Sequence, residues 1–413
     1  MSEEEKYSQM GGELIEQIRA TTGLSHEMSQ VTLQTVLRFL NANVKNLPDD
    51  IPGILESLYV PHAIRNNPGI IDRSSDAREL RQIFKKLTEC KDDEQQRSWA
   101  LHEDEGMIME NLDKLIQILK QADQSISIHV MQRDHYENVH ALVLYYQMET
   151  RWSIRELLLE VFALISTIDL KAVSVLLNSI LPMELVREIT SNIENSTRVT
   201  LSASVVGLLW STGEPMPVTH FDQVGESFLN VILDCIENPP NDDEAIVDVF
   251  TNLVLAYNLQ FKNVGENVVL HALAKRDNAK AFTQKVVYLL NWEEDPIAVL
   301  PHEPKPPNSI LKLVTDLFTC PDTAEIFYTN DVKVLIDIVT RCVTDLGSGD
   351  PRRNTYLRLI RMVIKNSNYL EHKHRKGDLQ KSFTGILLEE DPASRGDQEL
   401  INSILEEFPN VFN

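Results

Sequence analysis

Apolar residues recur every three or four positions along most of this chain, a spacing that places them on one face of an α-helix. The pattern is clearest from Leu300 to Glu390, where three amphipathic helices are predicted. The first helix begins with Ser309 as its N-cap and is stopped by Pro321. The second ends at Gly347, and the third begins at Asp350-Pro351 as N-cap and first helical residue. The joints are short, which favours helices that pack against their neighbours in sequence.

The same period predicts helices through the rest of the chain, with Ser196 and Asn241 among the expected N-caps. No stretch alternates as a strand would. Helix pairs recur at roughly 40 residues, which is the period of HEAT and armadillo stacks. The predicted fold is therefore all-α, an α-solenoid of armadillo/HEAT-like helical repeats, with a bundle of unrelated helices as the alternative. A solenoid leaves one long concave surface for a partner.

Prolines divide the N-terminal part from the remainder. Pro48, Pro52, Pro61 and Pro68 fall within one short stretch, which is typical of a connector. Residues 1–70 are therefore predicted to be an N-terminal helical arm with a Pro-rich connector, frayed over its first ten residues. Residues 71–413 are predicted to form one armadillo-like repeat domain.

Charge and cysteine content narrow the functional classes. The chain has 39 Lys and Arg against 62 Asp and Glu, a formal net charge of −23, so nucleic acid and anionic lipid are predicted not to bind. The acidic N-terminus is unlike a signal peptide, and no apolar run reaches the length of a bilayer span, so no membrane insertion is expected. Four dispersed cysteines are typical of buried free thiols. These features predict a cytoplasmic protein.

Motifs for chemistry are missing from the sequence. It has no nucleophile elbow, zinc-protease helix, phosphate loop or dinucleotide fingerprint, so we expect no enzyme, no cofactor and no metal site. The segment Pro301–Pro307 contains two overlapping P-x-x-P spacings. These fit either a polyproline ligand for an SH3 domain or a rigid crossing between two helices.

One segment reverses the charge of the chain. From Arg352 to Lys376 eight Lys or Arg face one acid, Glu371, so this segment is +7 while the remainder is −30. At 100° per residue one face of the third helix carries cations and the other packs. The candidate partner-binding residues are Arg352, Arg353, Arg358, Arg361, Lys365, His372, Lys373, His374, Arg375 and Lys376. The alternative is a solvated face neutralised by acidic neighbours such as Glu389, Glu390 and Asp391.

Several separate short motifs in the sequence resemble those of one known family. They are Leu181–Leu185 (LPMEL), His302–Pro307 (HEPKPP), Ile326–Asp331 (IFYTND) and Tyr369–Arg375 (YLEHKHR). In this order they are similar to the C-terminal leucine-rich, armadillo-like domain of the WISH/DIP family, the NCK-interacting protein with an SH3 domain and its fungal relatives. The likeness covers about Tyr136–Leu388.

The resemblance implies a function and a location. Members of this family bind and activate the Arp two-three complex without a preformed mother filament, which gives linear, unbranched actin filaments that seed branched networks. By this resemblance the partners are the complex and, indirectly, the actin filament, at the cell cortex and endocytic sites. The family's SH3 domain and its contacts to NCK and formins have no counterpart in these residues. The alternative is an α-solenoid adaptor, a formin-regulatory or cargo scaffold, without nucleation activity.

Overall fold

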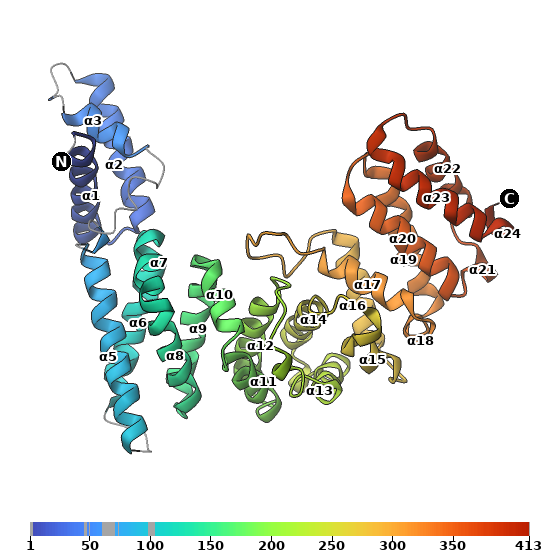
Figure 1. The fold of residues 1–413 in the computed structure, drawn as a ribbon, viewed down its shortest axis with the longest axis horizontal. Helices are drawn as coiled ribbons and strands as arrows, with labels where there is room; N and C mark the ends of the chain where they lie inside the picture. The colour runs from blue at the N-terminus through green and yellow to red at the C-terminus, as the bar shows by residue number, and fades with distance from the viewer. Residues whose placement is uncertain are drawn as a thin grey trace. The chain divides into compact units, whose positions relative to one another are not determined.

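The computed structural model describes residues 3–44, 48, 50–59, 71, 72, 74–97 and 104–412. Every regular element in these ranges is an α-helix or a short 3-10 helix, and none is a strand (Figure 1). The predicted all-α class of helical repeats is confirmed. Contacts divide the chain into two compact units, Met1–Leu181 and Pro182–Asn413.

The first unit begins with three helices packed on each other, α1 (Glu3–Thr22), α2 (His26–Asn43) and α3 (Asp50–Ser57). Their shared core consists of Ile15, Leu33, Leu37, Ile54 and Leu58. Helix α1 already runs through residues 3–10, so the prediction of a frayed start is wrong. It ends where Gly23 takes a φ of +72°, the left-handed conformation in which glycine lacks the steric cost of a side chain.

The remaining helices of the first unit form two packed rows. Helix α8 lies between α5 and α10 in one row, while α6 and α9 pack together in the other. Their apolar stripes face inward, as the period predicts, and Phe162 and Leu158 at the centre of α9 are fully buried. The bounds are α5 (Ser75–Arg97), α6 (Glu105–Gln121), α7 (Gln124–Gln132), α8 (Glu137–Met148), α9 (Trp152–Ile168) and α10 (Leu170–Leu177).

The second unit begins with four long helices; from α15 onward it repeats a short helix followed by two long helices, and it ends on a short one. The short helices are α15 (Val268–Ala274), α18 (Pro321–Ala324), α21 (Tyr369–His372) and α24 (Pro409–Phe412). The long helices are α11 (Leu181–Ser191), α12 (Ser196–Trp210), α13 (Glu226–Glu237), α14 (Glu244–Asn258), α16 (Lys280–Trp292), α17 (Ser309–Thr319), α19 (Thr329–Asp345), α20 (Pro351–Asn366), α22 (Lys376–Leu387) and α23 (Arg395–Glu407).

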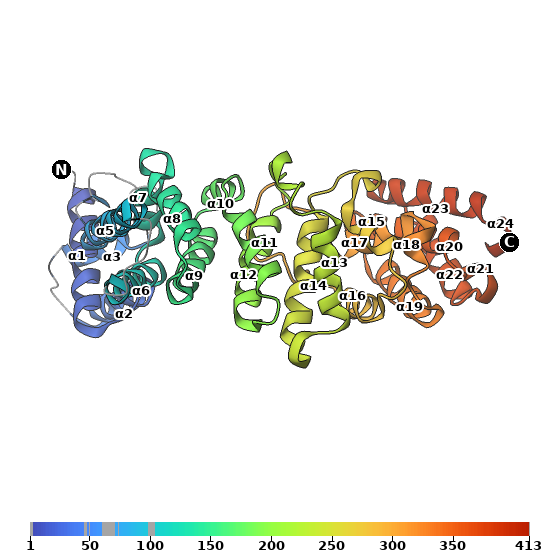
Figure 2. The same ribbon diagram turned by 90° about the horizontal axis from the view of Figure 1, so that it is seen from below.

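Equivalent helices of successive repeats pack side by side. Helices α13, α16, α19 and α22 form one row, and α12, α14, α17, α20 and α23 form the other, so each repeat contacts mainly the next one (Figures 1 and 2). Apolar side chains fill the space between neighbouring helices, for example Trp210 of α12 against Tyr257 of α14, whose ring centres lie 5.0 Å apart. This nearest-neighbour packing is that of a helical solenoid.

Three predicted N-caps are off by one or two residues. Asn308, rather than Ser309, caps α17, because its side chain accepts the Leu311 N–H at 2.9 Å. Ser309 is instead buried and donates to Asp295 Oδ1 at 2.7 Å. In the same way Asn195 replaces Ser196 at the start of α12, and Asp243 replaces Asn241 at α14. In each case the residue that caps is the one whose carbonyl-type oxygen reaches the free N–H groups.

The predicted boundary at residue 70 falls in 60–70, outside the described residues, and stays a prediction. The four cysteines are free thiols. Cys235 and Cys342 are buried as expected, whereas Cys90 and Cys320 are only half-buried.

Candidate partner-binding surface

Helix α20 presents two faces of opposite character. It begins at the predicted residue, since Asp350 accepts the Arg352 N–H at 2.9 Å and Pro351 occupies the first turn. Its apolar face is buried and consists of Tyr356, Leu357, Leu359, Ile360, Val363 and Ile364. The opposite face carries Arg358, Arg361 and Lys365, as the helical period predicts.

Arg353 does not belong to this exposed face. Its side chain is 1% exposed and donates from Nε to Asp397 Oδ2 at 2.7 Å. Both terminal nitrogens donate to Glu389 at 2.8 Å, and further bonds reach Ser394 Oγ and the Leu346 carbonyl. The prediction that Arg353 contacts a partner is therefore wrong: its guanidinium is already saturated by the protein.

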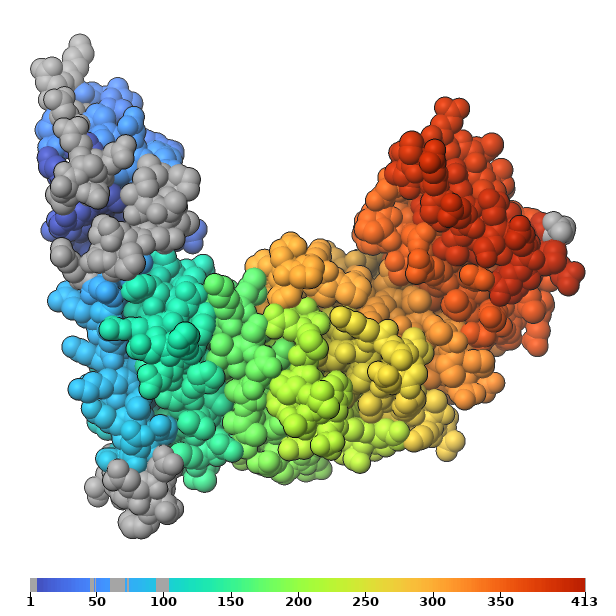
Figure 3. Space-filling model, viewed as in Figure 1, coloured from blue at the N-terminus to red at the C-terminus, as the bar shows by residue number. Residues whose placement is uncertain are grey.

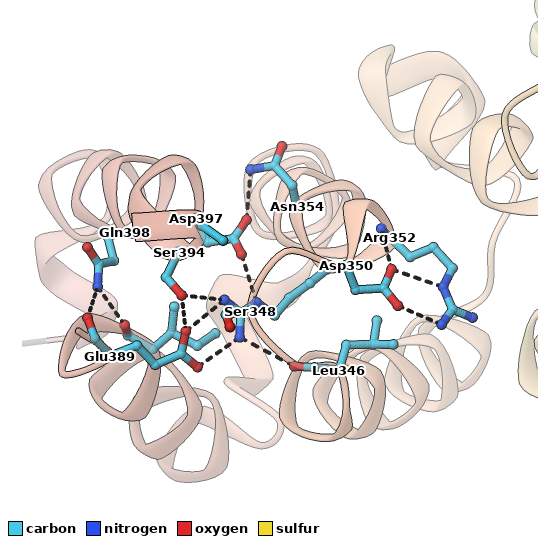
Figure 4. Close-up of polar contacts among 12 residues, drawn as sticks. Leu346, Ser348, Asp350, Arg352, Asn354, Glu389, Ser394, Asp397 and Gln398 are labelled. Atoms are coloured by element: carbon cyan, nitrogen blue, oxygen red, sulfur yellow. Dashed lines mark hydrogen bonds and ion pairs between the residues drawn. The ribbon is translucent and has the colours of Figure 1, made fainter. Parts of the chain in front are cut away.

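The acids around Arg353 come from the next repeat. Figure 4 shows Asp397 on α23 and Glu389, which follows α22, converging on this one site, with Asn354 donating to Asp397 Oδ1 at 2.9 Å. The hydrogen bond from Arg353 holds the pKa of Glu389 below its ordinary value. We call Arg353, Glu389, Ser394 and Asp397 the buried ion cluster. It joins α20 to α23 and to the segment that precedes α23.

The cations on the exposed face are partly neutralised. Arg361 Nε lies 2.5 Å from Glu407 Oε2, and Lys365 Nζ lies 3.7 Å from Glu407 Oε1. Arg358 donates to Asn354 Oδ1 at 3.0 Å, and within the described residues no carboxylate lies in ion-pair range of it. Arg358, Arg361 and Lys365 thus form a continuous strip, exposed at Arg358 and Lys365 and half-buried at Arg361, which we call the basic ridge.

The turn after α20 divides its cations between two sides. Lys373 Nζ donates to the Asn410 carbonyl beside α24 at 3.2 Å. His374 Nε2 and Arg375 Nε instead lie 2.8 Å and 2.7 Å from Asp337 Oδ1 on α19. Burial acts to raise the pKa of Asp337, but hydrogen bonds from Arg375 and His374 hold it below its ordinary value. Lys373 thus contacts the segment beside α24, while His374 and Arg375 contact α19, and binding of a partner by these residues stays a prediction.

His372 adds little positive charge at neutral pH, because burial lowers its pKa below the ordinary histidine value. Arg352 is paired with Asp350 at 2.7 Å. Lys376 is half-buried at the start of α22, and no carboxylate among the described residues lies in ion-pair range of it. Internal carboxylates thus offset much of the segment's charge. Arg358, Lys373 and Lys376 have no ion-pair partner among the described residues, and Arg361 and Lys365 share one carboxylate, Glu407.

The proline-rich segment is tied to the helices beside it. His302 Nε2 lies 3.1 Å from Glu214 Oε1, and Nδ1 of the same ring lies 3.1 Å from the Pro304 carbonyl. Pro306 approaches Gly213, where a Cβ would meet it at 3.5 Å. This arrangement is that of an ordered crossing between α16 and α17. An SH3 ligand at Pro301–Pro307 stays a prediction.

Sequence reasoning assigned no role to two exposed aromatic residues, Tyr288 and Trp292 on α16. Their spacing of four residues puts them on one helix face, and the neighbouring charged residue Lys285 shares that face. The available signal was the aromatic pair on the polar side of an amphipathic helix.

Two kinds of comparison bear on the identity of the chain. Residues 243–379 match the family model of the leucine-rich domain of SPIN90/Ldb17. Protein dip1 of Schizosaccharomyces pombe is 35% identical over 104 residues, which is 25% of this chain and 25% of that protein. Protein LDB17 of Saccharomyces cerevisiae is 25% identical over 178 residues, 40% of this chain and 33% of that protein.

The matched parts span only a quarter to a third of these relatives. The family match nevertheless contains α14 to α21 with the basic ridge and the turn that follows it, together with three of the four motifs that carry the resemblance. The resemblance to the WISH/DIP family is thereby confirmed: residues 243–379, within the second unit, are similar to the leucine-rich domain of SPIN90/Ldb17.

Proposed function

We propose that this chain activates the Arp two-three complex and so nucleates linear, unbranched actin filaments without a preformed mother filament. The observation that carries the proposal is the match of residues 243–379 to the SPIN90/Ldb17 leucine-rich domain. The solenoid of the second unit is consistent with it, because a preformed surface loses little conformational entropy on binding.

The physical mechanism would be a shift of populations. A ligand activates the complex only to the extent that it binds the active arrangement better than the inactive one. A change from 1:99 to 99:1 requires a preference of about 5.5 kcal/mol. A rigid ligand that contacts two subunits at once can supply such a difference, since it fits only one relative placement of them.

We further propose that the basic ridge contributes to this binding through an acidic surface of the partner. Arg358 is exposed and free of any carboxylate among the described residues, and Lys365 is 55% exposed. Such contacts act mostly on the association rate and weaken with added salt.

The assay is the assembly of pyrene-labelled actin with and without the complex. We expect this chain to accelerate assembly only when the complex is present, and microscopy to show linear filaments in the absence of seeds. If assembly is unchanged, or if new filaments grow only from the sides of older ones, the proposed activity is excluded. Binding of the complex without acceleration would favour the alternative, an adaptor scaffold.

The basic ridge is tested by a triple variant, Arg358→Glu, Arg361→Glu and Lys365→Glu. Binding to the complex should weaken by about tenfold or more, because rim charge reversals slow association. The matched control reverses Lys262, Lys275 and Lys280, three exposed cations elsewhere in the second unit, and so changes net charge equally. Equal binding of both triple variants would show that the ridge is only a solvated face.

A location in the cytoplasm, at cortical or endocytic actin, is part of the same proposal. Within the ranges that the structure describes, no helix is both long and apolar enough to cross a lipid bilayer. Fluorescence microscopy of the tagged chain beside an actin-patch marker tests this location, and a diffuse signal that ignores the marker would contradict it.

A further inference from the structure

A small groove opens on the second unit between α12, α14 and the segment that follows α16. Its volume is about 160 Å³, and its lining is mostly apolar: Gly207, Leu208, Val249, Leu253, Ile297 and Val299. Figure 3 shows the orange surface of the segment after α16 lying against the green-to-yellow surface beside it. The side chain of Val299 is 64% exposed at the edge of this groove.

Two large aromatic side chains are exposed on α16, the helix that precedes the groove-lining segment. Tyr288 and Trp292 lie one turn apart on α16, 53% and 62% exposed, with ring centres 6.1 Å apart. Tryptophan and tyrosine are the residue types most enriched among those that dominate binding energies at protein interfaces. They offer a large contact area with few torsions to immobilise.

The aromatic pair and the groove are parts of one surface. Lys285 Nζ lies 5.4 Å from the centre of the Tyr288 ring and 2.5 Å from Asp248 Oδ1 on α14. Asn252, one helical turn after Asp248 on the same face of α14, lines the groove. From Trp292 the chain also runs within a few residues to Ile297, which lines it too. We call this the aromatic-groove surface.

The surroundings of this surface are acidic. Asp248, Glu244, Glu293 and Glu294 are all exposed near it. Asp248 is paired with Lys285, and Glu293 with Arg341 at 2.9 Å. Within the described residues no cation lies in ion-pair range of Glu244 or Glu294. An apolar centre with a negative rim favours a partner with the complementary pattern.

We propose that the aromatic-groove surface binds a peptide segment of a partner protein that carries apolar side chains flanked by Lys or Arg. One apolar side chain enters the groove beside Val249 and Ile297, and a second packs on Tyr288 and Trp292. The basic flanks meet Glu244 and Glu294. This site is separate from the basic ridge, which requires an acidic partner, and it does not depend on the proposed function.

Charge favours a basic, apolar peptide over two other possible occupants of this surface, a second copy of the chain and an anionic lipid surface. A second copy would bring the same acidic rim against itself, and the chain as a whole carries −23. An anionic lipid surface would be repelled for the same reason. A basic, apolar segment gains from both features of the surface.

The test is a selection of random 16-residue peptides, displayed on phage, against the full chain and in parallel against its Trp292→Ala variant. Peptides enriched only on the original chain should combine apolar residues with Lys or Arg. A synthetic copy of the most enriched peptide is then titrated by fluorescence anisotropy. Its affinity should fall at least about tenfold with Trp292→Ala and about threefold or more with Tyr288→Ala.

The matched control is Tyr328→Ala, an equally exposed tyrosine at 56% at the start of α19, which should leave binding unchanged. Circular dichroism checks that all variants are folded. Enrichment of acidic peptides, or of peptides indifferent to Trp292→Ala, overturns the proposal. So does sedimentation that detects a dimer of the original chain and a monomer of the Trp292→Ala variant, since the surface would then join two copies.

Discussion

Replacing Arg353 with alanine tests whether the buried ion cluster holds α20 against α23 and the segment that precedes α23. The substitution removes five hydrogen bonds and leaves two carboxylates without their cation. Asp397 is 5% exposed and cannot recover full hydration, although Asn354 still donates to it. Glu389 is about a third exposed and can be hydrated again, so it contributes less than Asp397 to the loss of unfolding free energy.

Breaking a buried ion pair on one side costs about 3–5 kcal/mol. Because one of the two acids here can reach water, we expect Arg353→Ala to lower the unfolding free energy by about 3 kcal/mol, the lower end of this range. The adjacent variant Arg352→Ala is the matched control, since its ion pair with Asp350 is half-exposed and contributes at most about 1 kcal/mol.

The chain has two units, so a single unfolding transition is not assumed. Hydrogen exchange read by mass spectrometry reports on α20, α22 and α23 separately from the first unit, and urea titration gives the overall loss. In Arg353→Ala these three helices should exchange faster, while α5 to α10 should not change. Protection and urea midpoint equal to those of Arg352→Ala would refute the stabilising role of the cluster.

Three further predictions follow from the same contacts. The difference in unfolding free energy between the original chain and Arg353→Ala should shrink as pH falls from about 5 to 3. The folded-state pKa of Glu389 is depressed, so its contribution to stability is present above the unfolded carboxyl pKa of about 4.3 and is lost below it. Urea titrations at several pH values measure this difference, and a difference that does not change with pH would contradict the prediction. Glu407→Gln should free Arg361 and Lys365 and raise binding of an acidic partner by about two- to fivefold in anisotropy titrations with a labelled polyglutamate peptide, whereas the exposed neighbour Glu406→Gln should not. Burial raises the pKa of Cys235 to about 11, so its thiol should react with iodoacetamide far more slowly than Cys90 or Cys320 in peptide mapping; equal rates would mean that α13 opens readily.

The fold could be predicted because its cause is periodic. Apolar positions on one face of each helix determine which side is buried, so the predicted inner positions of α19, such as Leu335 and Val339, are fully buried. The caps could be located only to within one or two residues, since Asn308 and Ser309 are both good candidates. Only the three-dimensional turn decides which oxygen reaches the free N–H groups.

The site was harder to predict than the fold, because burial of a cation depends on partners distant in sequence. Arg353 and Arg352 are adjacent and chemically identical, yet one lies against Asp397 and the other near solvent. The helical period places Arg353 on the same face as Leu357 and Ile360, but nothing local to the sequence identifies the acids that pair with it there. Trp292 was missed for a different reason: it lies on the polar side of α16, but aromatic residues are generally expected to be buried.

The buried ion cluster also governs where this array of repeats can be shortened or extended. Helix α20 supplies the cation, while the acids arrive with the repeat that follows. A chain ended after Leu388 would keep the cation and lose Glu389 and Asp397, leaving a positive charge in an apolar setting. A chain ended after Leu346 would lose the cation and the acids together, and would only expose one face of α19 to solvent. Gain or loss of whole repeats is therefore easier at the joint before α20 than at the joint before α23, and this charge pairing ties α20, α22 and α23 together as one unit.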